Sequence, residues 1–418
     1  MNDDLRHRIA MTRVVCILGM IYVHVPTGHP DSVVYALSLA QWGTTIQGFL
    51  IEGIGRASAA LLSIVSGYLT AVALSKQGAT SSALYRRRFE SIIVPMILWG
   101  AITIAVYGLI SLTRETFLNF EHQSLFSAAL TYVNFVAFLT DIPVGPTMHL
   151  SFLRDLFVCI LLSPLLVFVL RRAAIPVLVA LAFLYLADIE TFVILRPLVL
   201  FAFAIGLHLA LSHARMELLD DAWPLWLLLS AVATISLLLY NGGAMSGLDE
   251  IFQRFGLDTK ESFLYPLSRV FGALAIWTVL SRLVGTRWQG WIESMTPYLF
   301  AAYCSHYLML TLMWFGLWQP AFGSDRFYMV WFLAAPLVTM LVAWSIVNGT
   351  AIVWPNAAAR LTGGRVNRPL RESKPVTDRP AIANAGTVDM SESADKISAE
   401  DTEDSSVQAR QKKNLARA

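Results

Sequence analysis

Long apolar segments separated by short charged ones constrain this chain more than any other feature. Its charged residues cluster at 1–13, 76–90, 213–221, 249–261, 282–293 and after 360. The apolar stretches between them reach the roughly 20 residues that a helix needs to cross a bilayer. Only 14% of the residues are charged and the mean hydropathy is +0.59, whereas a soluble domain carries about 25% charged residues. We therefore predict an all-α, polytopic transmembrane bundle of about ten helices.

Loop charges set the predicted topology. With the N-terminus inside, most loop Lys and Arg fall on the cytoplasmic side, as the positive-inside rule requires. Segment 125–141 would move Arg171 and Arg172 outside if it spanned, so we predict a re-entrant or interfacial helix on the outer face. Both termini are then cytoplasmic. The predicted spans are 9–26, 55–75, 91–112, 147–170, 174–189, 192–212, 223–240, 264–284, 295–318 and 328–354.

The two ends of the chain differ in character. Arg13 interrupts the first apolar run and no small-x-small cleavage site follows Pro26, so the first segment is predicted to be a retained helix rather than a signal peptide. The C-terminal stretch is rich in Ser, Asp, Glu, Ala and Lys with almost no aromatic residues, and cannot bury enough surface to fold. We predict a transmembrane domain over 1–358 and a disordered cytoplasmic tail over 359–418.

Composition also argues against several classes of function. The net charge of +2 and the lack of a basic stripe interleaved with aromatic residues give no reason to expect nucleic-acid binding. No metal site and no permanently bound cofactor are predicted. All the cysteines lie in apolar segments and are predicted to be buried and free rather than disulfide-bonded: Cys16, Cys159 and Cys304.

Two ionisable residues lie within the first predicted span. Arg13 and His24 are separated by about 16 Å along a helix and lie near one face. Arg13 suits a snorkelling anchor near the cytoplasmic boundary. His24 would lie deeper, where an imidazole needs a partner, and an ionisable group inside a membrane is a functional candidate by default.

A basic run, Arg86-Arg87-Arg88, precedes the third predicted span. One interpretation is topology alone, because arginines accumulate on the cytoplasmic side. The other is an anion site, since guanidinium groups bind phosphate through paired hydrogen bonds. A cytosolic phosphate-bearing cosubstrate such as coenzyme A would suit it. Charge alone favours the topological interpretation.

Further polar residues lie toward the outer side. Arg154 and Asp155 point about 100° apart on a helix and are predicted to pair with other helices rather than with each other. They serve either to hold helices together or to contact substrate. Other arginines at a similar depth would form an outward-facing polar vestibule: Arg56, Arg196 and Arg269. His149 begins this segment, and His306 is a second intramembrane histidine, more simply explained by structural hydrogen bonding; His208 is predicted to be interfacial.

With these features together, the chain resembles the acyltransferase 3 family of bacterial membrane O-acyltransferases over about residues 8–350. The Arg-x10-His pattern of Arg13 and His24 and the stretch Leu62-Ser63-Ile64-Val65-Ser66-Gly67-Tyr68-Leu69, similar to FFxxSGYL, carry most of the resemblance. Supporting features are a basic segment closed by Pro95, His149–Val158 like WFLxxL, and Tyr303–His306 like the family's late Tyr/His helix.

Three departures accompany the resemblance. Ser151 stands where the family has Trp, Leu62 and Ser63 replace the paired phenylalanines, and Glu90 and Ser91 stand where many members carry another arginine. Within the family, Tyr22-Val-His24-Val-Pro26 and the overall plan are most similar to the succinoglycan succinyltransferase type.

The resemblance implies acyl transfer from cytosolic acyl-CoA, succinyl or acetyl, to a sugar hydroxyl of a cell-surface glycan, an exopolysaccharide or a lipid-linked precursor, in a bacterial inner membrane. The phosphates would dock on Arg86, Arg87 or Arg88, and the pantetheine arm would pass Arg13. His24 would act as general base or as a covalent acyl carrier. Membrane lipid and polysaccharide-synthesis machinery are the expected partners. The residues expected near the acceptor are Arg56, His149, Arg154, Asp155 and His306.

Two other classes fit the composition. A transporter or flippase for a glycan or organic anion would use His24, Arg56, Arg154 and Asp155 as a substrate path. A non-catalytic scaffold of a polysaccharide synthase fits less well, because scaffolds rarely need buried arginine and histidine. Release of free CoA from labelled acyl-CoA separates an enzyme from both.

Overall fold

Helices make up all the regular secondary structure in the part of the chain that the structure describes. A computed structural model describes residues 3–25, 42–76, 80–113, 148–187, 189, 196–214, 216–245, 247–254, 258–323 and 327–366. Segment 125–141, predicted to be re-entrant or interfacial, lies outside these residues. The main helices are α1 (Asp3–Val23), α3 (Arg56–Leu74), α5 (Val94–Thr113), α8 (Ser151–Leu186), α9 (Pro197–Leu211), α10 (Trp223–Asn241), α12 (Tyr265–Ser281), α14 (Leu299–Met313) and α16 (Tyr328–Val353).

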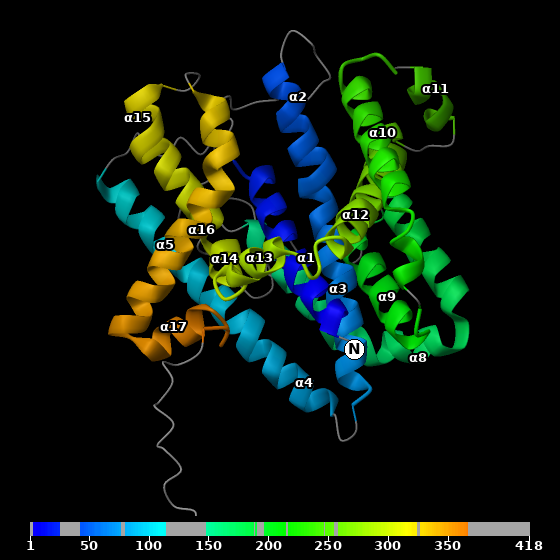
Figure 1. Ribbon diagram of the computed structural model, residues 1–418, viewed down its shortest axis with the longest axis horizontal. Helices are drawn as coiled ribbons and strands as arrows, with labels where there is room; N and C mark the ends of the chain where they lie inside the picture. The colour runs from blue at the N-terminus through cyan, green and yellow to red at the C-terminus, as the bar shows by residue number, and fades with distance from the viewer. Residues whose placement is uncertain are drawn as a thin grey trace, which may run out of the picture. The chain divides into compact units, whose positions relative to one another are not determined.

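Shorter helical segments extend or connect these helices. The π-helical segments are η1 (Phe49–Gly55), η2 (Phe89–Ile93), η5 (Lys260–Leu264) and η6 (Trp314–Trp318), and the 3-10 turns are η3 (Met148–Leu150) and η4 (Met216–Leu219). The short α-helices are α2 (Trp42–Gly48), α4 (Ser81–Arg88), α11 (Gly247–Gln253), α13 (Arg287–Ser294), α15 (Gln319–Phe322) and α17 (Pro355–Leu361). Helices α4 and α17 lie at the end of the bundle where the chain begins, and α2, α11 and α15 lie at the opposite end (Figure 1).

The described residues contain seven helical stretches long and apolar enough to cross a membrane. They are Trp42–Leu74, Ser81–Ile110, Ser151–Leu186, Trp223–Asn241, Ser262–Ser281, Leu299–Phe322 and Tyr328–Val353, and Pro197–Leu211 is a shorter apolar helix. The all-α, multi-pass architecture predicted from the sequence is therefore confirmed, while the count of about ten and the side on which the termini lie stay predictions.

A kink in α8 explains why the sequence divides this helix into two predicted spans. Ala173 has non-helical dihedral angles (φ −146°, ψ 56°) inside the helix. Pro176 follows it, and a proline inside a helix removes one backbone hydrogen bond and clashes with the carbonyl four residues earlier. The predicted boundary between 147–170 and 174–189 coincides with this kink.

Glycine lets α3 and α9 pack backbone against backbone. A Cβ added at Gly67 would overlap with the carbonyl oxygen of Phe203, and one added at Gly206 would overlap with that of Ile64. Small residues allow such close approach between membrane helices. The glycine of the Ser66-Gly67-Tyr68-Leu69 motif therefore has a packing role in the structure.

Replacing Gly67 by alanine should lower the stability by about 1–3 kcal/mol, because the backbones of α3 and α9 must move apart. Gly108→Ala is the matched control, since a Cβ there meets nothing within 4 Å. Cys16, Cys159 and Cys304 are all buried and free, so a thiol-reactive dye can follow thermal unfolding in detergent. Equal unfolding temperatures for the two variants would contradict the close packing.

Candidate functional site

Three histidines that are far apart in the sequence converge in the bundle. His24 follows the last turn of α1, His149 lies in η3 and His306 lies in α14. The ring centroid of His306 lies 5.2 Å from that of His24 and 4.7 Å from that of His149. The rings of His24 and His149 are 6.3 Å apart. His149 and His306 are buried, whereas His24 is partly exposed. Three of the predicted site residues therefore form one imidazole cluster.

Backbone carbonyls fix the tautomers of the two buried rings. Nε2 of His149 lies 3.0 Å from the carbonyl oxygen of Cys304, and Nδ1 of His306 bonds to the carbonyl oxygen of Tyr303. A carbonyl oxygen only accepts, so these ring nitrogens carry the protons of the neutral rings. Nδ1 of His149 and Nε2 of His306 are buried and make no hydrogen bond within the described residues. Each is therefore a lone pair able to accept a proton or a hydrogen bond.

Two tyrosines of α14 complete the imidazole cluster. The Tyr307 ring stacks on that of His149 at 5.7 Å and 11° and lies 6.0 Å from that of His24. The Tyr303 hydroxyl donates to the carbonyl oxygen of His149, and its ring lies 5.6 Å from that of His306. Tyr303 belongs to the family's Tyr/His motif, but the sequence alone does not predict that it lies at the site.

Close packing of α1 against η1 and α3 determines where His24 lies. A Cβ added at Gly55 would lie 2.6 Å from Cγ2 of Val23, and one added at Gly19 would lie 2.7 Å from Oγ of Ser58. Glycine at these positions brings the end of α1 close to the start of α3. His24 is thereby held within electrostatic range of Arg56.

A cavity of about 340 Å³ lies beside Tyr303. Three arginines from distant parts of the chain line it: Arg13 from α1, Arg88 at the end of α4, and Arg365 after α17. Tyr303 lines the same cavity and contacts the imidazole cluster. We call this space the arginine cavity. It joins Arg13 to the imidazoles through a single side chain.

The arginine cavity is strongly cationic. Among the described residues, neither Arg13 nor Arg88 forms an ion pair, and Nε of Arg88 is buried without a hydrogen-bond partner. Arg365 donates to the backbone oxygens of Ser91 and Thr362 and lies 4.1 Å over the Phe300 ring. Burial, followed by the nearby positive charge of Arg13, lowers the pKa of Arg365 to about 10, so this side chain stays charged near neutral pH. Such a cluster favours an anion.

The structure separates the three arginines of the basic run. Arg88 lines the arginine cavity. Arg86 pairs with Glu90 at 3.1 Å and its side chain is 84% exposed, and Arg87 is exposed as well. Arg365 takes part instead, although the sequence places it in the predicted tail. The described contacts thus continue past residue 358, through α17, to Val366.

Arg154 and Asp155 bond to each other, and here the prediction was wrong. Nε and Nη2 of Arg154 donate to Oδ1 of Asp155 at 3.0 and 2.8 Å. Arg196 donates to Oδ2 of Asp155 at 3.0 Å and also to Ser151. The 100° rotation separates Cβ directions, but a long arginine side chain can fold back onto its neighbour. The predicted contact with another segment comes from Arg196, so one buried carboxylate holds two arginines.

A second basic cluster surrounds Tyr265. Arg56, Arg269 and Lys260 lie 5.0, 5.0 and 5.2 Å from its ring centroid. Arg56 also pairs with Glu52 at 2.7 Å. We call Arg56, Lys260, Tyr265 and Arg269 the Tyr265 cluster. The predicted vestibule arginines thus divide between this cluster and Asp155.

The described residues contain no group of three His, Cys, Asp or Glu side chains arranged to hold a metal ion. His208 lies in the last turn of α9, a helix that contributes no residue to the imidazole cluster. The site therefore consists of imidazoles, tyrosine hydroxyls and guanidinium groups. These groups can move protons and bind anions.

Comparison with known proteins identifies the family to which this chain belongs. The acyltransferase domain model of the acyltransferase 3 family matches residues 6–348, and the chain therefore belongs to this family of membrane acyltransferases. It is 24% identical over 397 residues, covering 92% of this chain and 98% of the relative, to the succinoglycan biosynthesis protein ExoH of Rhizobium meliloti (strain 1021). No solved structure matches the chain.

Proposed function

We propose that this protein transfers an acyl group from cytosolic acyl-CoA to a sugar hydroxyl of an exopolysaccharide or its lipid-linked precursor in the bacterial inner membrane. One observation carries the proposal: a cavity lined by three arginines meets an imidazole cluster at Tyr303. Membership of the acyltransferase 3 family supports acyl transfer, and similarity to a succinoglycan biosynthesis protein supports exopolysaccharide synthesis.

The arginine cavity would hold the phosphates of the donor. Arg13, Arg88 and Arg365 supply three guanidinium groups from separate segments, which suits an anion with several phosphates. The pantetheine arm would then extend past Tyr303 toward the imidazoles. Arg86 and Arg87 would not contact the donor, because they lie outside the cavity.

His24 would act as the general base. It is the partly exposed member of the cluster, and its ring lies 5.2 Å from that of His306, whose Nε2 lone pair is unprotonated. An N–H of His24 donating to that lone pair would leave the other nitrogen of His24 free to take the hydroxyl proton. His306 would then be a positioning residue, and His149 would line the acceptor side.

The reaction balances as a simple acyl transfer. The sugar oxygen attacks the thioester carbonyl as His24 removes its proton. The C–O bond forms, the C–S bond breaks, and the proton passes from His24 to the departing sulfur. The products are a sugar ester and free CoA.

Arg56 and Arg196 favour a donor that carries its own carboxylate. Arg56 and Arg196 lie within electrostatic range of His24. Arg196 and Arg154 share the one carboxylate of Asp155, so the negative end of a succinyl group would be attracted by the positive charge in excess there. We therefore propose succinyl-CoA over acetyl-CoA.

Purified protein supplied with labelled succinyl-CoA and a glycan acceptor should release free CoA and form an acylated glycan. Acetyl-CoA in the same assay should give a lower kcat/KM. A transporter would give neither product. Failure to form an ester with either donor, using protein that still binds acyl-CoA, would contradict the proposed function.

A further inference from the structure

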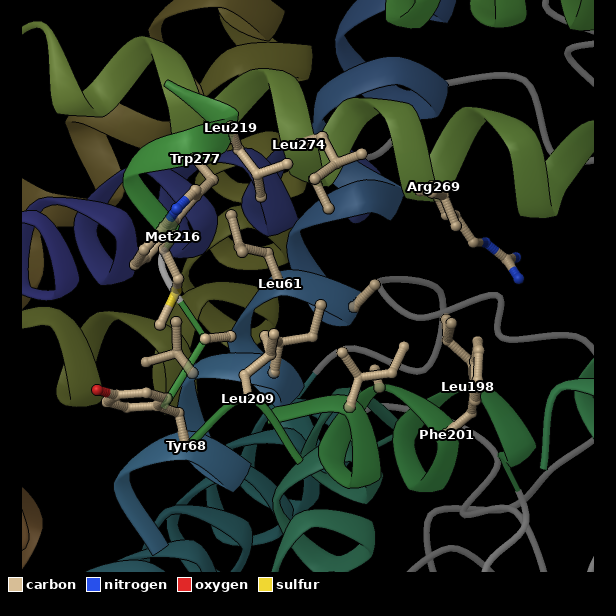
Figure 2. A pocket seen from close by; sticks show the side chains of 18 of the residues that line it. Leu61, Tyr68, Leu198, Phe201, Leu209, Met216, Leu219, Arg269, Leu274 and Trp277 are labelled. Carbon is tan, nitrogen blue, oxygen red and sulfur yellow. The ribbon is translucent and has the colours of Figure 1, made fainter. Parts of the chain in front are cut away.

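A second cavity, of about 460 Å³, lies between α3, α9 and α12, away from the imidazole cluster. Its lining is almost entirely apolar, with Leu61 of α3, Phe201 and Leu209 of α9, and Leu274 and Trp277 of α12 among its side chains (Figure 2). We call it the lateral groove. The donor and the acceptor hydroxyl as described above need no such surface.

The lateral groove has the dimensions of a hydrocarbon chain in one leaflet. Along α12 it extends from Arg269 to Trp277, and along α9 from Leu198 to Leu209. At 1.5 Å rise per residue these stretches measure about 12 and 16 Å. The hydrocarbon core of one leaflet is about 15 Å thick. A chain lying along these helices would fill the groove along its length.

The two ends of the groove differ. Among the described residues, Arg269 is the one cation that lines the groove, and it lies at one end, away from Trp277, Met216 and Leu219 (Figure 2). Arg269 donates to the Tyr185 hydroxyl at 3.2 Å and, within the described residues, forms no ion pair. Lys260 shares the Tyr265 ring with it and is likewise without a described ion pair. An amphiphile in this groove would meet positive charge at that end alone.

The charged end of the groove is linked to the candidate site through Arg56. Arg269 and Arg56 both lie 5.0 Å from the Tyr265 ring, and Arg56 is in electrostatic range of His24. A headgroup bound at the Tyr265 cluster would therefore share the Tyr265 ring with Arg56, whose charge acts on His24. A lipid that merely fills a gap between helices needs no such neighbour.

We propose that the lateral groove binds the hydrocarbon chain of a lipid phosphate that carries the acceptor sugar, with the phosphate on Arg269 and Lys260. This rests on the proposed function and specifies its acceptor as lipid-linked. The groove holds the lipid in one orientation, and the sugar attached to its phosphate then extends toward Arg56 and His24. Binding in the groove would hold the acceptor sugar in position for His24, so that the two groups need not meet by diffusion in the membrane.

A photoactivatable long-chain polyprenyl phosphate provides the binding test, with the full-length protein in lipid nanodiscs. Crosslinks should map to peptides of α3, α9 and α12, and unlabelled polyprenyl phosphate should compete at least tenfold better than phosphatidylglycerol. Leu274→Trp, which fills the groove, and Arg269→Gln, which removes the cation, should each reduce labelling at least fivefold. The control Leu341→Trp adds the same side chain at a position of α16 that is 63% exposed, and should label like the wild type.

Competition by phosphatidylglycerol as effective as that by polyprenyl phosphate would identify a general lipid contact and overturn the proposal. So would labelling unchanged by Leu274→Trp. The competition result is read on the wild type, so it stands even where a variant fails to fold.

Activity supplies a separate readout. The ratio of acyl transfer to a polyprenyl-linked saccharide over transfer to a short soluble saccharide should fall at least tenfold in Leu274→Trp and stay unchanged in Leu341→Trp. Wild-type protein that acylates neither acceptor would refute the proposed function. Wild-type protein that acylates both, with a ratio that Leu274→Trp leaves unchanged, would refute the groove proposal alone.

Discussion

His24→Ala should reduce acyl transfer by about 10²–10⁴-fold, the usual contribution of a positioned general base. A sugar hydroxyl is a weak nucleophile near neutral pH, and no other imidazole of the cluster is partly exposed. Binding of acyl-CoA should persist, because Arg13, Arg88 and Arg365 are untouched. The measurement is the rate of ester formation at saturating donor, with protein abundance in the membrane matched to wild type.

His208→Ala is the matched control for the loss of an imidazole. His208 lies in the last turn of α9 and, in the part of the chain that the structure describes, has no ring contact with the cluster. The His208→Ala variant should transfer the acyl group at the wild-type rate. Full activity in His24→Ala would end the role of His24 as base, and a rate lost equally in both variants would show a general effect of removing histidine.

The first helix is where sequence reasoning reached furthest. Arg13 and His24 stand out because ionisable groups are costly inside a membrane and must have a use, and the structure places them at the arginine cavity and the imidazole cluster respectively. The sequence shows each of these two residues as a candidate by itself. Their link through Tyr303 depends on how α14 packs against α1, which no local pattern encodes.

The convergence of the three histidines could not be predicted from the sequence, because it too depends on how the helices pack. In the sequence, His149 and His306 are each explained by a structural hydrogen bond, and each does donate to a backbone carbonyl. What makes them chemically useful is the second ring nitrogen, which the described residues leave without a hydrogen bond. Only the spatial arrangement shows that these rings lie beside His24.

Arg365 shows how composition can mislead near a boundary. The residues after 358 read as the start of a polar tail, yet Gly363 and Gly364 take positive φ angles of 62° and 78° and turn the chain after α17. Such a turn at a helix C-terminus is a recognised glycine signal. It brings Arg365 onto Ser91 and Phe300. The Gly363-Gly364 pair was the feature that could have revealed it.

Neutralising the arginine cavity should abolish tight donor binding. Arg13→Gln and Arg88→Gln should each weaken acyl-CoA binding by about 10–100-fold, because a hydrogen bond to a charged group contributes about 1.5–3 kcal/mol. The loss should appear in the Kd for acyl-CoA and in the donor KM, with a smaller change in kcat at saturation.

Arg86→Gln is the control that makes this prediction specific. Arg86 belongs to the same basic run, but it is exposed and paired with Glu90, and surface ion pairs contribute about 0–1 kcal/mol. Its Kd should stay within about twofold of wild type, a change under 1 kcal/mol. An equal loss in Arg86→Gln and Arg88→Gln would mean that the run attracts the donor through its summed charge alone. The arginine cavity would then not be the phosphate-binding site, and the proposed path of the pantetheine arm from Arg13 to the imidazoles would lose its support.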